Sequence, residues 1–212
     1  MDPQERLRAA MASLTLPPPA KAGRGRLVSV AMTLFYHRGI SPVGLDEIVA
    51  ETGVTKTTFY KHFRSKTELV VAAIEARHAW QMTAWKEAVE ILVGPDPRDQ
   101  LQGMFDVLDL AFNEPSFQGC HFINAAAEFP NPHDPVHRAA ARHKQASHQW
   151  FRELAERAGA TRPSEFADAY AMFFEGVLVI RQVHARADVA RAAGPHVRRL
   201  LDAFIPNGRK ST

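Results

Sequence analysis

Apolar residues recur every three or four positions along most of this chain, which is the spacing that places them on one face of an α-helix. Leu27, Ala31 and Leu34 follow this spacing, and Gly39 stands where it can end their helix. No stretch alternates apolar and polar residues between hairpin turns, as a strand would. The pattern therefore predicts an all-α protein of about nine helices.

Glycine, proline and capping residues mark the breaks between the predicted helices. Gly53 separates two short helices, and Ser65 with Glu68 has the spacing of a capping box at the start of a long helix. Gly194 and Pro195 are placed to kink the last helix. After the helix that Gly39 ends, we predict helices at 45–52, 56–62, 66–92, 98–112, 117–129, 135–158, 164–187 and 189–204.

Residues 1–23 are predicted to form a flexible N-terminal extension. Asp2 and Pro3 suit the start of a short helix that would run to about Leu14, and Pro17–Pro19 would end it. Residues 24–70 and 71–212 are predicted to form a small and a larger helical domain.

Positive charge is concentrated in the first third of the chain. The net charge is only +3, yet residues 1–70 contain 10 Lys and Arg against 6 Asp and Glu. A surface that meets a polyanion such as DNA carries this kind of excess. On charge alone, a basic face that is merely solvated explains the excess equally well.

The composition is that of a globular protein, with 46% hydrophobic and 23% charged residues. No apolar run approaches the roughly 18–20 residues that cross a bilayer. Glu5, Arg6 and Arg8 stand where a signal peptide would have its apolar core, and the single cysteine, Cys120, cannot form an internal disulfide. We therefore expect a cytoplasmic protein.

The stretch from Leu45 to Phe63 has the pattern of a helix-turn-helix. Two short helices meet at Gly53, where a residue that tolerates positive φ lets the chain turn sharply. Ile48, Phe59 and Phe63 are spaced to share a core. The remaining face of the second helix is short and polar, which suits the base edges and phosphates of a major groove.

The string Gly53-Val-Thr-Lys-Thr-Thr-Phe-Tyr-Lys-His-Phe63, followed by Arg64-Ser-Lys-Thr-Glu-Leu69, resembles the signature of TetR-family regulators. The resemblance covers about residues 24–70, and it departs from the family at Thr57, where glycine is common, and at Gly44, where Ser or Thr is typical. It implies a helix-turn-helix DNA-binding domain at 24–70 and an effector-binding and dimerisation domain at 71–212. A helical hairpin with solvated basic residues is the alternative.

The family resemblance assigns DNA contacts position by position. Residues at the start of the second motif helix should face bases or nearby phosphates, and Lys66 should reach a phosphate at the N-terminus of the long helix. The two arginines before the first helix could enter the minor groove, or lie in an uninvolved tail. The predicted DNA-binding residues are Arg24, Arg26, Thr55, Lys56, Thr57, Thr58, Tyr60, Lys61, His62 and Lys66.

The larger domain is expected to form a homodimer and to receive a small-molecule effector. By resemblance the last two helices would form a four-helix interface; the predicted interface residues are Phe166, Phe173, Gly176, Val177, Ile180, Leu200, Leu201 and Phe204. A monomeric core helix is the alternative for the penultimate helix. The candidate effector-pocket residues are Trp80, Met104, Phe105, Leu108, Phe112, Cys120, Phe122, Phe151, Tyr170 and Phe174, each of which could equally be plain core.

Cys120, at the expected start of a helix, is either a redox sensor or a small packing residue. The histidines, including His133, His137, His143 and His148, lack the spacing of a zinc site, so we expect no metal and no cofactor. No catalytic motif is present, so we expect no enzyme. The resemblance predicts a repressor that an effector releases from a palindromic operator, or a regulator that acts instead through a protein partner or Cys120.

Overall fold

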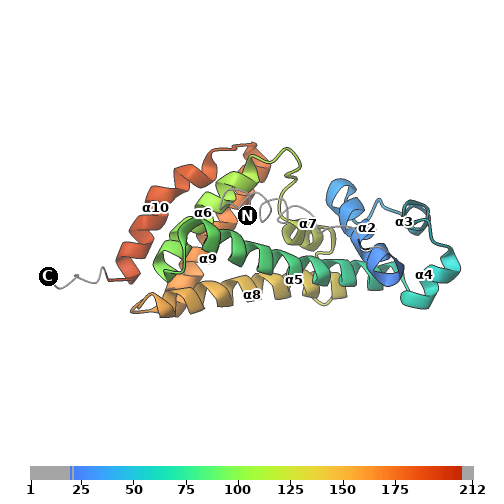
Figure 1. Cartoon of the computed structure of the whole chain (residues 1–212), viewed down its shortest axis with the longest axis horizontal. Coiled ribbons are helices and arrows are strands. Elements are labelled where there is room, and N and C mark those ends of the chain that lie inside the picture. The colour runs from blue at the N-terminus through green and yellow to red at the C-terminus, as the bar shows by residue number, and fades with distance from the viewer. Residues whose placement is uncertain (1–19, 21, 207–212) are drawn as a thin grey trace. The chain divides into compact units, whose positions relative to one another are not determined.

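The computed structural model describes residue 20 and residues 22–206, which form nine α-helices and no strand (Figure 1). This confirms the predicted fold class. The short helix predicted between Asp2 and Leu14 lies outside the described residues. The described chain packs as two compact units: an N-terminal unit of residues 20, 22–83 and 118–144, and a C-terminal unit of residues 84–117 and 145–206.

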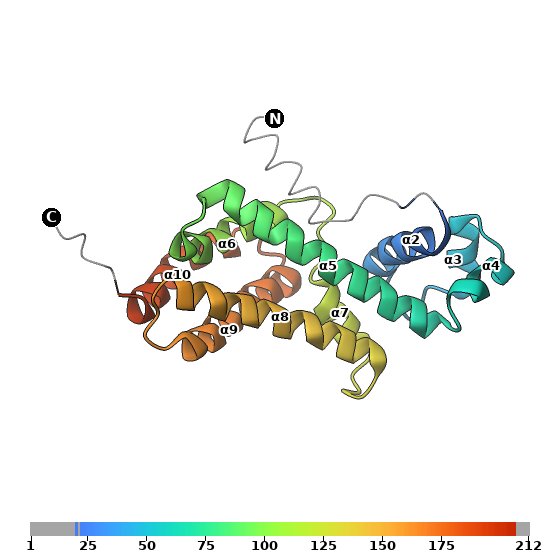
Figure 2. The ribbon, with the colours of Figure 1, turned by 60° about the horizontal axis from the view of Figure 1, so that its bottom comes forward.

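The N-terminal unit contains α2 (Gly23–Arg38), α3 (Leu45–Thr52), α4 (Lys56–His62) and α7 (His121–Glu128). The first parts of α5 (Lys66–Val93) and α8 (Pro135–Arg157) complete it. Within this unit the first part of α5 runs beside α7 and the first part of α8 (Figure 2). The two Nδ1 atoms of His78 on α5 and His143 on α8 lie 3.0 Å apart, which fixes that pairing.

Helix ends in this unit follow local capping chemistry. Gly39 and Gly53 end α2 and α3 with φ angles of 82° and 68°, a region where glycine lacks the steric penalty of other residues. Thr55 caps α4, because its Oγ1 accepts a hydrogen bond from Thr58 N at 3.1 Å. Ser65 Oγ accepts from Glu68 N, and Glu68 accepts in return from the backbone N–H of Arg64 rather than of Ser65.

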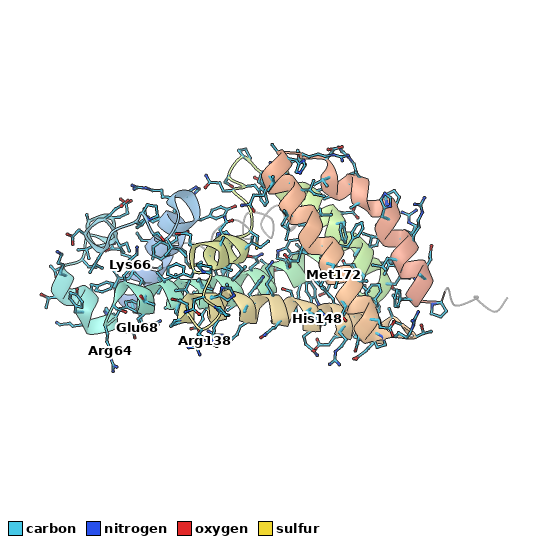
Figure 3. All side chains as sticks on the ribbon, turned by 180° about the vertical axis from the view of Figure 1, so that it is seen from behind. Arg64, Lys66, Glu68, Arg138, His148 and Met172 are labelled. Carbon is cyan, nitrogen blue, oxygen red and sulfur yellow. The ribbon has the colours of Figure 1, made fainter. Side chains whose placement is uncertain are left out.

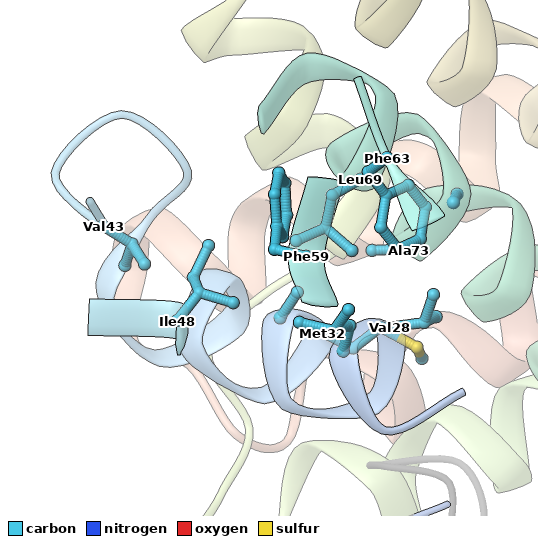
Figure 4. Packing of buried hydrophobic residues seen from close by; sticks show 11 residues of the cluster. Val28, Met32, Val43, Ile48, Phe59, Phe63, Leu69 and Ala73 are labelled. Carbon is cyan, nitrogen blue, oxygen red and sulfur yellow. The ribbon is translucent and has the colours of Figure 1, made fainter. Parts of the chain in front are cut away.

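The three short helices share one core with the start of α5 (Figure 4). Phe59 of α4 and Phe63, the residue that ends this helix, pack with Ile48 of α3. All three side chains are buried, as predicted. The other buried members come from α2, the turn after it and α5: Leu27, Val28, Ala31, Met32, Val43, Leu69, Ala72 and Ala73. This core fixes α4 against α2 and α3.

The C-terminal unit contains α6 (Pro97–Phe112), α9 (Pro163–His184), α10 (Val189–Phe204) and the remaining parts of α5 and α8. Asp96 caps α6 by accepting hydrogen bonds from the N–H groups of Arg98 and Asp99. The buried hydroxyl of Tyr170 donates to Leu101 O at 2.6 Å, so this phenol carries a satisfied hydrogen bond inside an aromatic core.

Two predicted boundaries are wrong. The helix expected from Phe117 begins at His121, because Gln118 and Gly119 bind Tyr36 through their backbone and Gly119 has a φ of 90°. The helix expected to reach Ala187 ends at His184, where Ala185 adopts a left-handed conformation with a φ of 53°. Both departures come from backbone geometry that apolar spacing does not encode.

Candidate nucleic-acid interface

The outer face of α4 carries the side chains predicted to meet DNA. Lys56, Thr57, Tyr60, Lys61 and His62 are all exposed. Tyr60 is 57% exposed, although its neighbour Phe59 is fully buried. The Tyr60 ring meets the Phe59 ring edge to face, and most of the Tyr60 side chain remains open to solvent. The helix therefore separates a buried apolar face from a polar, basic one.

Part of the positive charge on this face is paired within the unit. Lys56 Nζ lies 2.6 Å from Asp46 Oδ1 on α3, and this hydrogen bond and the charge of Asp46 raise the pKa of Lys56. Arg38 at the end of α2 pairs with Glu47. DNA phosphates would compete with these carboxylates. Among the described residues, no carboxylate forms an ion pair with Lys61 of α4.

The remaining predicted contacts divide by their role in the fold. Thr58 is half-buried and shares the cap with Thr55, since their hydroxyl oxygens lie 3.0 Å apart. Arg24 and Arg26 are exposed in the first turn of α2, and the guanidinium of Arg24 lies 4.9 Å from the centre of the Phe63 ring. Arg24 therefore contacts the core that α2, α3 and α4 share, and we call these three helices the head.

Lys66, which was predicted to contact a phosphate, binds two backbone carbonyls of its own chain. It lies in the first turn of α5 (Figure 3), and its Nζ donates to Ile40 O at 2.6 Å and to Ser41 O at 3.4 Å. Burial lowers the pKa of Lys66, and the charge of Glu128 opposes that effect. The ammonium group has three N–H donors, so a phosphate contact would use the third donor or replace one of these two carbonyls.

The turn after α2 is also held from the other side by Glu128, the last residue of α7. Its carboxylate accepts from Ile40 N at 2.8 and 3.0 Å and from Ser41 N at 2.6 Å. Burial alone would raise the pKa of Glu128, but these hydrogen bonds lower it below its usual range. No local sequence pattern pointed to this contact across 88 positions, and it makes α7 a support of the head.

A second contact joins α2 to the start of α7. The hydroxyl of Tyr36 accepts from Gln118 N at 2.7 Å and donates to Gly119 O at 3.4 Å. The Tyr36 ring stacks on His121, with ring centres 3.7 Å apart and planes 6° from parallel. Burial raises the pKa of Tyr36 and lowers that of His121 well below its usual range, so both are neutral near pH 7.

Cys120, the N-cap of α7, is buried and has a lysine neighbour that the sequence did not reveal. Lys144 Nζ on α8 lies 3.4 Å from Cys120 Sγ. The two residues are 24 positions apart and on different helices, so only the fold brings them together.

Most of the candidate effector-pocket residues form the interior of their units. Phe105, Phe151, Tyr170 and Phe174 are in ring contact with one another. Met104, Leu108, Phe112, Cys120 and Phe122 are buried as well, and Trp80 is half-buried. Phe122 lines a cavity of about 40 Å³ in the N-terminal unit. A wider hollow of about 270 Å³ in the C-terminal unit is lined by residues that the sequence did not single out, among them Lys86, Glu90, Trp150 and Arg157.

The predicted dimer residues lie on different sides of their helices. Phe166, Val177 and Leu201 are buried within the C-terminal unit, so their side chains already have partners in their own chain. Phe173, Gly176, Leu200 and Phe204 are half-buried and Ile180 is exposed. Three exposed apolar residues of α9, Met172, Val179 and Val183, were missed (Met172 is labelled in Figure 3).

The histidines that were weighed as metal ligands have other neighbours. His137 Nδ1 lies 2.7 Å from Phe129 O, and His148 Nε2 lies 2.8 Å from Asp168 Oδ1. The ring of His143 stacks on Phe122 at 3.5 Å, and burial lowers the pKa of His143 to about 2. Within the described part of the chain, no three His, Cys, Asp or Glu residues gather as a metal site would require.

A short helical head, a glycine turn and a basic outer face on α4 define the class of helix-turn-helix regulators. Residues 27–73 match the family model described as bacterial regulatory proteins of the tetR family, and residues 97–204 match one described as a tetracyclin repressor-like C-terminal domain. The chain belongs to the TetR family. Members of this family are transcriptional regulators and not enzymes. This confirms the prediction of a regulator and the prediction that the chain is not an enzyme.

Relatives and a solved structure agree with this assignment. FasR, a transcriptional activator from Mycolicibacterium smegmatis, is 42% identical over 60 residues, which cover 28% of this chain and 27% of FasR. KstR2, a transcriptional repressor from Mycobacterium tuberculosis, is 28% identical over 82 residues, which cover 39% of this chain and 40% of KstR2. The chain therefore spans less than half the length of these curated relatives.

A TetR-family transcriptional regulator from Streptomyces coelicolor superimposes with a TM-score of 0.76 at 29% identity, covering 85% of this chain and 95% of that one. This likeness extends well beyond the helix-turn-helix. Among residues 20 and 22–206, no helix is both long and apolar enough to cross a membrane.

Proposed function

We propose that this chain is a dimeric repressor that binds a palindromic operator through α4 and leaves it when a small molecule binds. The observation that carries the DNA-binding step is the outer face of α4, where Tyr60, Lys61 and His62 are exposed over a fully buried Phe59. In a dimer, two such helices about 34 Å apart would enter successive major grooves on one side of the duplex.

The test is a fluorescence-anisotropy titration on sites selected from genomic DNA, repeated over a range of salt concentrations. Lys61→Ala should weaken binding to all sequences alike and lower the salt slope by about two units, because the dimer loses one phosphate contact from each of its two subunits. Lys86→Ala, an exposed lysine in the C-terminal unit, is the matched control and should leave the slope unchanged. Equal slopes for all three proteins would refute a phosphate contact by Lys61.

The proposed dimer interface is one face of α9. Met172 and Val183 are 75% and 72% exposed, and with Gly176 and Val179 they follow the i, i+4, i+7, i+11 spacing of one helix face. A Cβ added at Gly176 would meet nothing within 4 Å, so packing within the chain does not require the glycine. A close approach by a second copy of the helix accounts for the exposed apolar face and for the glycine.

Repression is part of the proposal, because the relatives differ in this respect: FasR is named an activator and KstR2 a repressor. A reporter gene placed behind a selected operator distinguishes the two. Deletion of the regulator gene should raise expression; a fall in expression would make the protein an activator.

A second mode of control is favoured by the contact between Cys120 and Lys144. A neighbouring cation is one of the settings in which cysteines become reactive. A Cys120 thiolate that attacks hydrogen peroxide would form an S–O bond and release hydroxide, which leaves a sulfenic acid at the start of α7. Peroxide should then lower operator affinity in the wild type but not in Cys120→Ser. Equal loss in both proteins would exclude this mode.

A further inference from the structure

A hollow of about 270 Å³ lies in the C-terminal unit, where α5 and α8 both end. Arg157 is the last residue of α8, and Pro95 follows closely after the end of α5; both line the hollow. Pockets for drug-sized ligands have volumes of about 300–1,000 Å³, so this space suits a smaller molecule. The unpaired carbonyl groups at two helix C-termini add negative potential here, which favours a positively charged group.

Four charged side chains line the hollow, two from each helix. Lys86 and Glu90 are four positions apart on α5, and Glu153 and Arg157 are four positions apart on α8. Opposite charges at this spacing can form an ion pair, yet neither pair forms one among the described residues. Lys86 lies instead over the ring of Trp150, with its Nζ 5.6 Å from the ring centre. Two carboxylates and one guanidinium therefore line the hollow without an ion-pair partner in the described chain.

A nearly buried amide completes the polar lining. Gln100 of α6 is only 9% exposed, and its Nε2 donates to Gly94 O at 3.0 Å, which identifies the other atom of the amide as the oxygen. Within the described part of the chain, no donor binds this Oε1 atom. With Glu90 and Glu153, it gives the hollow three acceptor groups. A primary ammonium group has three N–H donors and matches that number.

We propose that this hollow binds a zwitterionic α-amino acid with an aliphatic side chain. The ammonium group of the ligand binds the three acceptors, and its carboxylate binds the planar fork of the Arg157 guanidinium. Pro95, Leu154 and the Trp150 ring offer apolar surface to its side chain. The inference goes beyond the proposed function and does not depend on it, because every lining residue belongs to the C-terminal unit and no step involves DNA.

Ligands with one kind of charge fit this lining less well. A monocarboxylate would pair with Arg157 but would bring its negative charge beside Glu90 and Glu153. A simple amine would pair with the two carboxylates but would add a second positive charge beside Arg157. Only a ligand with both signs of charge avoids both repulsions, and such repulsions are a source of specificity.

The test titrates L-leucine into the full chain and follows the indole N–H NMR signals of the three tryptophans. The Trp150 signal, identified by its loss in Trp150→Phe, should shift saturably. The signal of Trp80, which does not line the hollow, should stay in place. No saturable shift of the Trp150 signal would overturn the inference.

Two substitutions remove one charge each from the lining. Glu90 and Arg157 are exposed and have no ion-pair partner among the described residues, so Glu90→Gln and Arg157→Met should fold as the wild type does. Each should weaken leucine binding by about tenfold or more, because a hydrogen bond to a charged group is lost. Glu87→Gln, which removes an exposed carboxylate of α5 outside the hollow, is the matched control and should bind leucine normally. Wild-type affinity in either charge variant, or an equal loss in the control, would overturn the inference.

Probe chemistry separates recognition of both charges from recognition of one. Isoamylamine is leucine without its carboxylate, and isocaproate is leucine without its ammonium group. Each should bind at least about tenfold more weakly than leucine, because one set of charged contacts is missing. Binding of isoamylamine as tight as that of leucine would mean that the hollow recognises only a cation, and equally tight binding of isocaproate would mean that it recognises only an anion. Either result would overturn the inference.

Discussion

Glu128→Gln should destabilise the protein, because it removes the charge that holds the turn after α2. The carboxylate accepts from two backbone N–H groups, and an amide would present its NH₂ group to one of them. Hydrogen bonds to charged groups contribute about 1.5–3 kcal/mol each, and this site is half-buried, so we expect a loss of about 2 kcal/mol. For a chain of this length that corresponds to a fall in Tm of about 4–8 °C.

The destabilisation should also depend on pH in a defined direction. The folded-state pKa of Glu128 lies below its ordinary value of 4.5, so the carboxylate contributes its full stability above about pH 4.5. That contribution is lost as the pH falls from the unfolded-state pKa through the folded-state pKa. The gap in Tm between wild type and Glu128→Gln should therefore be constant near neutrality and narrow below pH 4.5.

Thermal unfolding followed by circular dichroism at one fixed protein concentration provides the measurement. Glu75→Gln is the matched control, since Glu75 forms an exposed ion pair with Arg142 in the same unit and such pairs contribute little. The reasoning would be refuted if Glu128→Gln melted with this control, or if its Tm gap stayed unchanged down to pH 3.5.

Three further substitutions test other parts of the structure. Tyr60→Phe should weaken operator binding and leave Tm nearly unchanged, because the hydroxyl is exposed; unaltered affinity at fixed salt would remove Tyr60 from the interface. Met172→Glu should shift the mass measured by light scattering from dimer towards monomer, whereas Ser164→Glu on the same helix should not; an intact dimer in both would place the interface elsewhere. Gly103→Ala should cost about 1–3 kcal/mol of unfolding free energy, because the new Cβ would lie 2.7 Å from a methyl carbon of Val93; a wild-type denaturation midpoint would show that Val93 moves aside freely.

The helices of the head were predictable because their signals are local. Gly53 and Ser65 each act within four positions, and the structure gives them the turn and the cap that the sequence predicted. The start of α7 was not predictable, since it depends on Tyr36 binding the backbone of residues 118 and 119. A pattern of apolar spacing contains no information on such distant backbone contacts.

The predicted functional residues also divide into those that local spacing placed correctly and those that depend on the fold. Tyr60 and Lys61 were placed on the exposed face of α4 because Phe59 defines the buried one. The dimer prediction was harder, because α9 is apolar around most of its circumference and the spacing could not tell which side its own chain covers. Val177 is buried within its own chain, whereas Met172 is exposed, and only the fold shows this difference.

The contact between Glu128 and the turn at Ile40 has a consequence for engineering. A chimeric regulator would join the DNA-binding segment of one chain to the sensor of another. Here the segment that would be exchanged takes two of its supports, Tyr36 with residues 118 and 119 and Ile40 with Glu128, from beyond any cut made in α5. A graft that ends in α5 would leave Ile40 N–H facing whatever the host supplies at the end of its own α7, so residues 118–128 should be transplanted together with the head.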